Sequence, residues 1–196
     1  MQVGCQSWTA RNLCVESYHE EILYYTTRWD ALCPYIEVSE EMLATAPRPF
    51  VTHERVRWAD VDLVSIMRFS AFTRLIEIAE QELLRAAGLP YAELFDNPRL
   101  WMPRRRLEID YFTPARLDDE LALVTYVSRM GETSLTLQVD VRDATRHTLV
   151  AAATMVVVCV TVAGFTKRPL PRSTRELLAP FVMTVDEARA GAPEIR

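Results

Sequence analysis

The sequence predicts an α+β fold in which a curved, antiparallel, five-stranded sheet wraps around one long central helix. Two observations lead to this prediction. A single amphipathic helical pattern follows one strand-like segment, and four more strand-like segments follow that helix with only short turns between most of them. Short turns join antiparallel strands, because parallel strands need long crossover connections. One helix cannot cover both faces of such a sheet, so we expect the sheet to curve around the helix and leave its other face for a second copy of the chain.

The first strand is expected over residues 52–58, and the central helix follows it. Ser70 is a candidate N-cap, and Gly88 with Pro90 provides a stop signal. The apolar residues between these signals recur at helical spacing and give the helix one apolar face: Phe72, Leu75, Ile76, Ala79, Leu83 and Ala86.

The rest of the domain reads as strands after an irregular stretch over residues 91–97. Apolar residues alternate with charged ones over residues 106–111 until Pro114, and a second alternating segment covers residues 135–142. Residues 121–129 are a mixed strand, with turns at 130–132 and 146–147. The uncharged run over residues 149–165 is too short for a typical membrane-spanning helix and is rich in Val and Thr. We therefore predict a buried strand there and no membrane span.

Composition and charge exclude several functional classes. The 196 residues are 49% hydrophobic and 25% charged, which is typical of a globular protein. The five glycines lie too far apart for a phosphate-binding loop. Residues 47–196 hold 20 basic and 20 acidic side chains, which argues against nonspecific nucleic-acid binding. Cysteine and histidine spacing does not fit a metal site, and the N-terminus lacks a signal-peptide pattern. We expect a cytoplasmic protein without a metal or another cofactor.

Pro47 and Pro49 mark a junction between two parts of the chain. Residues 1–46 carry the whole formal charge of −5 and three of the four cysteines. We expect an N-terminal extension over residues 1–46, which either contributes a helical piece or is a segment upstream of a natural start at Met42. The main domain is expected over residues 47–168, and a C-terminal tail with a short helix at 173–179 is expected over residues 169–196.

Asp60 and Asp62 lie in the loop that leads into the central helix. A carboxylate at this place lies beside unpaired backbone N–H groups and the positive end of the helix dipole. This arrangement suits acyl chemistry, because the acid can activate water or attack a carbonyl while the N–H groups bind the developing oxyanion. The alternative is that both acids only order the loop through an Asx turn or a cap.

Several short motifs in this order resemble the hotdog-fold acyl-CoA thioesterases of the 4-hydroxybenzoyl-CoA thioesterase type. The resemblance covers residues 52–171. It rests on VRWADVD at 56–62, on the helix with Phe72, Glu77 and RAAGL at 85–89, on LEIDY at 107–111 and on VVVCV at 156–160.

The resemblance implies roles for individual residues. In that family the second of two acids separated by one residue is catalytic, which makes Asp62 the nucleophile or general base. The backbone N–H of Phe69 matches the position that helps to polarise the thioester carbonyl. Ser65 replaces the glycine that the family has three residues after the catalytic acid. Glu77 matches a helix position where related hotdog thioesterases carry a catalytic glutamate, and an ordinary helix residue is the alternative.

Further residues are candidates for binding the substrate. Arg104 and Arg106 are expected on one strand face, where they could bind coenzyme A phosphates, as could Arg168 and Arg172. The alternative is a solvated strand start with acidic partners at positions 108 and 110. Four aromatic residues could line an acyl channel or pack in the core: Trp58, Phe69, Phe72 and Trp101.

The resemblance implies a homo-oligomer, a dimer or a dimer of dimers, that hydrolyses an acyl-CoA or acyl-carrier-protein thioester to a free acid and a thiol. One alternative is a noncatalytic acyl-CoA-binding hotdog protein, which the side chains of Ser65 and Phe69 favour. Another is a hydratase or dehydratase, although the loop over residues 60–69 has no histidine. A third would use Ser65 as nucleophile with His53 or His147 brought to it by folding.

Overall fold

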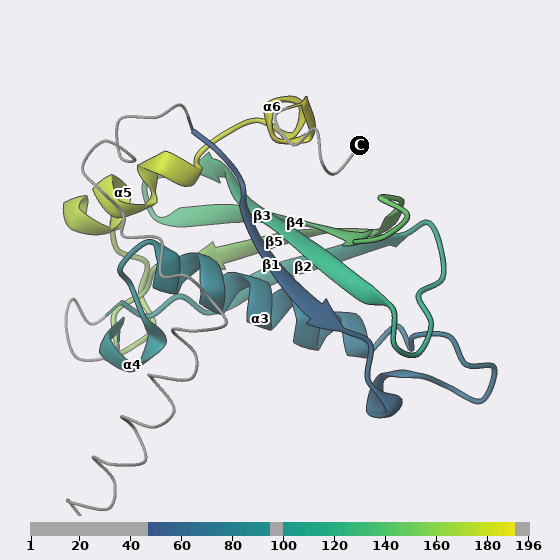
Figure 1. Cartoon of the computed structure of the whole chain (residues 1–196). Helices are drawn as coiled ribbons and strands as arrows, with labels where there is room; N and C mark the ends of the chain where they lie inside the picture. Colours follow the sequence, from purple (N-terminus) through teal and green to yellow (C-terminus); the bar gives the residue numbers. More distant parts are fainter. Residues whose placement is uncertain (1–46, 95–99, 191–196) are drawn as a thin grey trace, which may run out of the picture. The chain divides into compact units, whose positions relative to one another are not determined.

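A five-stranded sheet with the strand order β1-β3-β4-β5-β2 carries helix α3 on one face (Figure 1). The computed structural model describes residues 47–94 and 100–190. All strand pairs are antiparallel. The predicted α+β fold is confirmed. The strands are β1 Phe50–Arg55, β2 Arg104–Tyr111, β3 Glu120–Met130, β4 Ser134–Asp143 and β5 Leu149–Val158.

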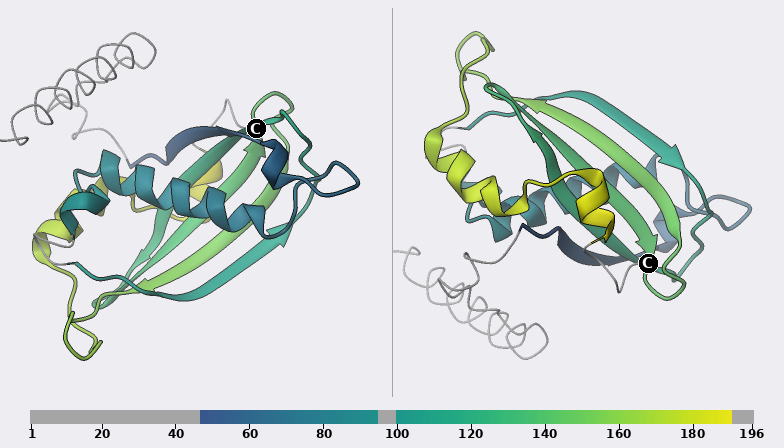
Figure 2. Two further views of the ribbon diagram at one scale, coloured as in Figure 1. Left: turned by 90° about the horizontal axis from the view of Figure 1, so that it is seen from below. Right: turned by 90° about the horizontal axis from the view of Figure 1, so that it is seen from above.

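Helix α3, Ala71–Ala86, lies in the concave side of the curved sheet, as the two views of Figure 2 show. Its apolar face is buried, and so are the inward-facing residues of β3, β4 and β5. The predicted stop signal is confirmed, because Gly88 has a φ of 73° and the Leu89 N–H donates to the Leu84 carbonyl at 2.8 Å. This is the geometry of a Schellman cap. Ser70 precedes the helix, but its side chain makes no capping hydrogen bond.

Two predicted segments differ from the structure. Strand β1 ends at Arg55, and Trp58 lies in a 3-10 turn, Trp58–Asp60, because the Asp60 carboxylate accepts the Arg57 N–H at 2.9 Å and turns the chain. Residues 91–94 form a short helix, α4 Tyr91–Leu94, where irregular chain was expected. Pro90 precedes α4 and fixes a backbone angle that suits the start of a helix.

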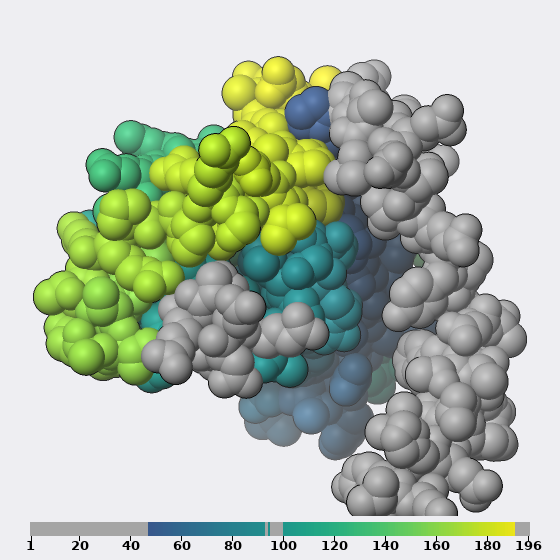
Figure 3. All heavy atoms as spheres, turned by 90° about the vertical axis from the view of Figure 1, so that its left-hand side faces the viewer, coloured from purple at the N-terminus to yellow at the C-terminus, as the bar shows by residue number. Residues whose placement is uncertain are grey.

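The C-terminal segment continues beyond the predicted short helix. Helix α5, Arg172–Leu178, agrees with the prediction within a residue, and its yellow-green atoms lie above the teal residues of α3 and α4 in Figure 3. The sequence did not predict α6, Val185–Ala190. It lies on the face of the sheet opposite α3, where the Arg189 guanidinium donates to both carboxylate oxygens of Asp140 at 2.8 and 2.9 Å.

The predicted extension over residues 1–46 lies outside the described residues, and the boundary at residues 168–169 stays a prediction. Of the uncharged segment over residues 149–165 that we expected to form a buried strand, only Leu149–Val158 forms a strand, β5, and the chain turns after it. In the part of the chain that the structure describes, the helices are too short or too polar to cross a membrane.

Candidate active site

A cavity of about 600 Å³ opens at the N-terminal end of α3. Its wall combines the loop that precedes α3 with the first turn of that helix and the end of β2. Apolar and aromatic side chains dominate this wall, as in most small-molecule sites. The residues that line it are Asp62, Ile66, Met67, Arg68, Phe69, Ser70, Phe72 and 111–115.

Asp62 borders this cavity, and the loop itself fixes its carboxylate. The Oδ1 atom accepts the backbone N–H groups of Val64 at 2.9 Å and Ile66 at 3.3 Å. This is the Asx-type turn that was one of the alternatives for the acid pair. The Oδ2 atom accepts no hydrogen bond from any described residue. Asp62 therefore orders its own loop with one oxygen and lines the cavity, and its other oxygen accepts no hydrogen bond from the described residues.

Phe69 lines the same cavity, and its backbone N–H donates to no acceptor within the described chain. It lies just before the first turn of α3, where backbone donors lack helical partners and the dipole favours negative charge. The Phe69 side chain is 76% exposed. The site therefore combines a carboxylate with an unpaired donor at a helix N-terminus.

Ser65 adopts the backbone conformation for which glycine is best suited. Its φ is 61°, in the left-handed region. The turn is closed by the Ser65 N–H, which donates to the Asp62 carbonyl at 3.0 Å, and by the Asp62 N–H, which donates to the Ile66 carbonyl at 2.9 Å. The loop thus follows a glycine-type path at the serine. Ser65 does not line the cavity.

Replacing Ser65 with glycine is expected to raise the free energy of unfolding by about 0.5–1 kcal/mol. The left-handed conformation costs a side-chain-bearing residue about 1–2 kcal/mol, and part of the gain is offset by the greater backbone entropy of glycine in the unfolded chain. Urea unfolding measures the difference. Ser70→Gly is the matched control, because Ser70 has a φ of −68° and glycine should destabilise the protein there. Equal effects of the two changes would contradict the assigned strain.

Phe72 and Tyr111 form the aromatic part of the cavity. Their rings meet edge to face with centroids 5.1 Å apart. The Tyr111 hydroxyl donates to the Phe69 carbonyl at 3.5 Å and so links β2 to the loop before α3. Of the four aromatic residues proposed for an acyl channel, Phe69 and Phe72 line the cavity, whereas Trp58 and Trp101 do not.

Sequence reasoning did not single out Tyr111 or Arg68 as residues of the site. The position of Tyr111 could have been predicted. It alternates with charged residues in step with Leu107 and Ile109, so it belongs to the strand face that meets the helix. No sequence pattern marked Arg68. Its N–H donates to the Asp60 carbonyl at 2.8 Å, and its guanidinium donates to the Ala59 carbonyl, so it holds the start of the loop.

Glu77, Arg104 and Arg106 do not line the cavity. Glu77 is exposed on α3. The expectation that the two arginines share a strand face is wrong, because a β-bulge between them pairs Arg104 with Val157 and Arg106 with Val156. The bulge inserts one residue and reverses the alternation. Their assignment to coenzyme A phosphates stays a prediction.

The two arginines have carboxylate partners within the domain. Arg106 pairs with Glu108, an exposed neighbour on the same strand. Arg104 pairs with Glu80, which is 1% exposed on the inner face of α3, and donates to the Tyr91 hydroxyl at 3.3 Å. Burial raises the pKa of Glu80 above its ordinary value, and Arg104 opposes this shift. Burial and the charge of Glu80 raise the pKa of Tyr91 to about 12.

Sequence reasoning also missed the buried Glu80. It follows Phe72 and Ile76 at intervals of four residues, which places it on the apolar face of α3. A charged residue at such a position signals a partner across the fold. His53 and His147, the histidines considered as partners of Ser65, do not hydrogen-bond to it. His53 is on β1, and His147 is in the turn before β5.

Comparison with known proteins shows which family the chain matches. The family model described as the thioesterase-like superfamily matches residues 56–179. This range contains the loop with Asp62, α3 and the four strands that follow it.

Individual proteins show the same likeness. An acyl-CoA thioester hydrolase, YbgC of Escherichia coli O6:H1, is 31% identical over 119 residues, which cover 61% of this chain and 87% of the relative. A 1,4-dihydroxy-2-naphthoyl-CoA hydrolase of Acaryochloris marina is 25% identical over 118 residues, or 60% of this chain and 86% of the relative. The crystal structure of a 1,4-dihydroxy-2-naphthoyl-CoA thioesterase from Synechocystis shares the fold. Its TM-score is 0.63 at 21% identity, over 67% of this chain and 96% of that one.

Proposed function

Because the chain belongs to the thioesterase-like superfamily, we propose that this protein hydrolyses an acyl-CoA thioester, or an acyl group on a carrier protein, to a free acid and a thiol. The observation that carries the proposal is that Asp62 and Phe69 line the same apolar cavity at the start of α3, and that the Phe69 N–H is unpaired within the described chain. The names of the relatives from Escherichia coli and Acaryochloris marina support coenzyme A as the thiol.

In the proposed reaction Asp62 takes up a proton, and the Phe69 N–H binds the negative charge on the carbonyl oxygen. The Asp62 Oδ2 atom removes a proton from water while the water oxygen attacks the thioester carbon. The Phe69 N–H stabilises the negative charge that develops on the carbonyl oxygen. The carbon–sulfur bond then breaks, and the sulfur leaves as a thiol with the proton that Asp62 took. The Val64 and Ile66 N–H groups hold the carboxylate in place through Oδ1 throughout.

Asp62 as nucleophile is the second route to the same products. In that route the carboxylate attacks the thioester carbon, the thiol leaves, and water hydrolyses the resulting mixed anhydride. A single turnover in ¹⁸O-labelled water separates the routes. Label in the Asp62 carboxylate after one turnover shows that water attacked an Asp62 anhydride and indicates the nucleophile. Label in the product acid alone shows that water attacked the acyl carbon, which the general-base route requires.

Thiol release over a panel of short, long and aromatic acyl-CoAs tests the function itself. Hydrolysis should release free coenzyme A with at least one member of the panel. Tight binding without thiol release would instead indicate a noncatalytic acyl-binding protein. Water addition to an enoyl thioester would indicate a hydratase.

We also propose that the protein acts as a homo-oligomer. Strand β2 has β5 on one side and is an edge of the sheet on the other. Two of its inward-facing side chains remain accessible, with Leu107 40% and Tyr111 50% exposed. Unpaired strand edges and exposed apolar groups favour association with another chain. Light scattering should give the mass of a dimer or tetramer, and the mass of a monomer would contradict the proposal.

We also propose the division of the chain that the sequence predicts. Residues 47–168 form the catalytic body, residues 1–46 are an extension, and residues 169–196 are a tail. Limited proteolysis tests the first boundary. Cleavage before Pro47 that leaves thiol release intact would support the proposal, and resistance to cleavage there would contradict a loose extension.

A further inference from the structure

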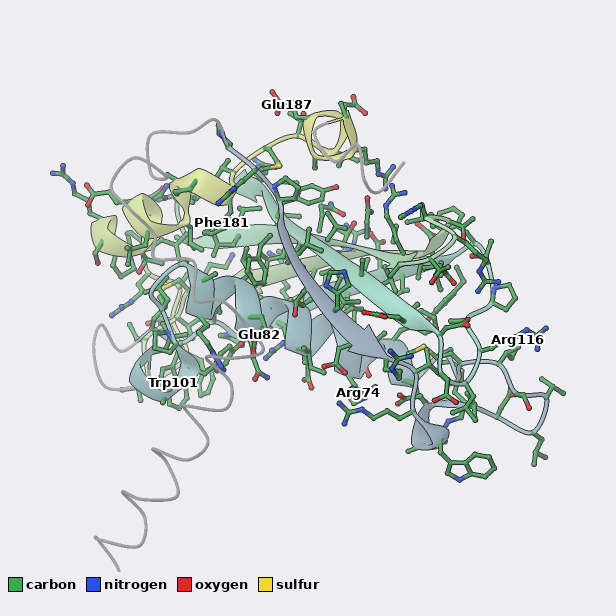
Figure 4. All side chains as sticks on the ribbon, in the orientation of Figure 1. Arg74, Glu82, Trp101, Arg116, Phe181 and Glu187 are labelled. Carbon is green, nitrogen blue, oxygen red and sulfur yellow. The ribbon has the colours of Figure 1, made fainter. Side chains whose placement is uncertain are left out.

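We infer that Arg74, through Asp60, is the positioning residue of the active-site loop: it holds the loop so that Asp62 and the Phe69 N–H meet the same substrate. This inference rests on the proposed hydrolysis at Asp62. It concerns a residue on α3 that lines no part of the cavity. In Figure 4 Arg74 lies at the end of α3 that adjoins the loop.

Asp60 ties together the two ends of the loop. Its side chain is 7% exposed. The Oδ2 atom accepts the backbone N–H of Arg57 at 2.9 Å, which fixes the chain where it leaves β1. The Asp60 carbonyl accepts the backbone N–H of Arg68 at 2.8 Å, which fixes the chain just before α3. A single residue therefore closes the segment that carries Asp62 and ends next to Phe69.

Arg74 connects this closed loop to the rigid part of the fold. Its Nη2 atom lies 2.6 Å from the Asp60 Oδ2 atom, and its Nε atom donates to Oδ1 at 3.3 Å. Its Nη1 atom also pairs with Glu54 on β1 at 3.4 Å. One guanidinium thus joins α3, the loop and β1. A planar guanidinium makes this two-point contact, whereas the ammonium group of lysine provides a point charge.

The position of this contact explains why it should affect the reaction. Asp62 is two residues after Asp60, and Phe69 is one residue after Arg68, so both reacting groups are adjacent to the points that Asp60 fixes. The side chain of Asp60 is almost completely buried, and without Arg74 it would lose its charged partner. A displacement of about 1 Å in an active site can reduce the rate by about 100-fold. The contact should therefore influence kcat more than substrate affinity.

Arg74→Met tests the inference, with Arg85→Met as the matched control. Arg85 is on the same helix and makes a 3.5 Å ion pair with Glu82, but it is far along α3 from the loop. We expect Arg74→Met to lower kcat by about 10- to 100-fold with a much smaller change in KM. Arg74→Lys should recover only part of the loss, and Arg85→Met should behave as the wild type. A folded Arg74→Met protein with the kcat of the control would overturn the inference.

Hydrogen exchange gives a second result that does not depend on activity. The amides of residues 61–69 should exchange faster in Arg74→Met than in Arg85→Met, whereas the amides of β4 should not differ. Equal exchange in the loop would overturn the inference. Asp60→Asn, which keeps the size of the side chain, serves the same measurement if Arg74→Met fails to fold. If loop exchange changes as expected but the wild type releases no thiol, the proposed function fails and the positioning contact stands.

Discussion

Asp62→Asn is expected to reduce kcat for thioester hydrolysis by about 10²–10⁴-fold, the range typical of lost general acid–base catalysis. Asparagine is nearly the same size as aspartate, and its carbonyl oxygen can still accept the Val64 and Ile66 N–H groups that now bond to Oδ1. It has no carboxylate to remove a proton from water or to attack the carbonyl. The loop should therefore keep its shape while hydrolysis of the thioester slows.

The measurement is thiol release at saturating substrate, with binding of the acyl-CoA measured separately. Affinity should change little, because Asp62 forms only part of a largely apolar cavity wall. Asp110→Asn is the control, since Asp110 is an exposed residue of β2 that does not border the cavity. Full turnover by Asp62→Asn on every hydrolysed thioester would show that Asp62 is neither the general base nor the nucleophile.

Arg104→Met is expected to lower the free energy of unfolding by about 3 kcal/mol at pH 8. The change leaves the carboxyl group of Glu80 at 1% exposure without its charged partner, and breaking a buried pair in this way costs about 3–5 kcal/mol. The Arg104 side chain is 39% exposed, which places the loss at the lower end of that range. Glu80→Leu should cost less than about 1 kcal/mol, because Arg104 can then turn toward water.

The pH dependence of Arg104→Met follows from the direction of the Glu80 shift. The pKa of Glu80 is already raised by burial, and loss of Arg104 raises it further. The folded protein then holds a proton that the unfolded chain releases more easily, so stability is retained below the ordinary glutamate pKa and lost as the pH rises through the folded-state value. Lowering the pH from 8 toward 5 should therefore recover part of the loss.

Urea unfolding of both single variants and of the double variant Glu80→Leu/Arg104→Met measures the coupling between the two residues. The double variant should be more stable than Arg104→Met alone. Arg106→Met is the control, because Arg106 pairs with the exposed Glu108 on the same strand and should contribute less than about 1 kcal/mol. Equal losses in Arg104→Met and Arg106→Met would contradict the assigned role of burial.

This protein has Ser65 at the loop position where the family has glycine. A side chain can alter the path of a loop that normally contains glycine. The structure keeps a glycine-type path at this position, with Ser65 in the left-handed region and both turn hydrogen bonds intact. Serine at this position therefore costs conformational energy, and the turn around it still holds the carboxylate of Asp62.

Local sequence patterns predicted α3, α5 and the strands of this fold, but they did not predict α4 or α6. The spacing of apolar residues predicted α3, and Gly88 with Pro90 marked its end, because helix periodicity and helix termination depend on neighbouring residues. Alternation and turn residues predicted the strands in the same way. The acid pair and its place before α3 indicated a candidate site in this loop, and the resemblance to the hotdog thioesterases implied the roles of Asp62 and the Phe69 N–H within it.

The tertiary structure alone decided which distant residues act together. Arg74 meets Asp60 across 14 positions, Arg104 meets Glu80 across 24, and Tyr111 meets Phe69 across 42. The β-bulge that separates Arg104 from Arg106 is a property of the pairing between β2 and β5 and leaves no mark in the alternation of β2. Such contacts depend on how the elements pack in three dimensions. Periodicity assigns a residue to a face, and packing determines what that face meets.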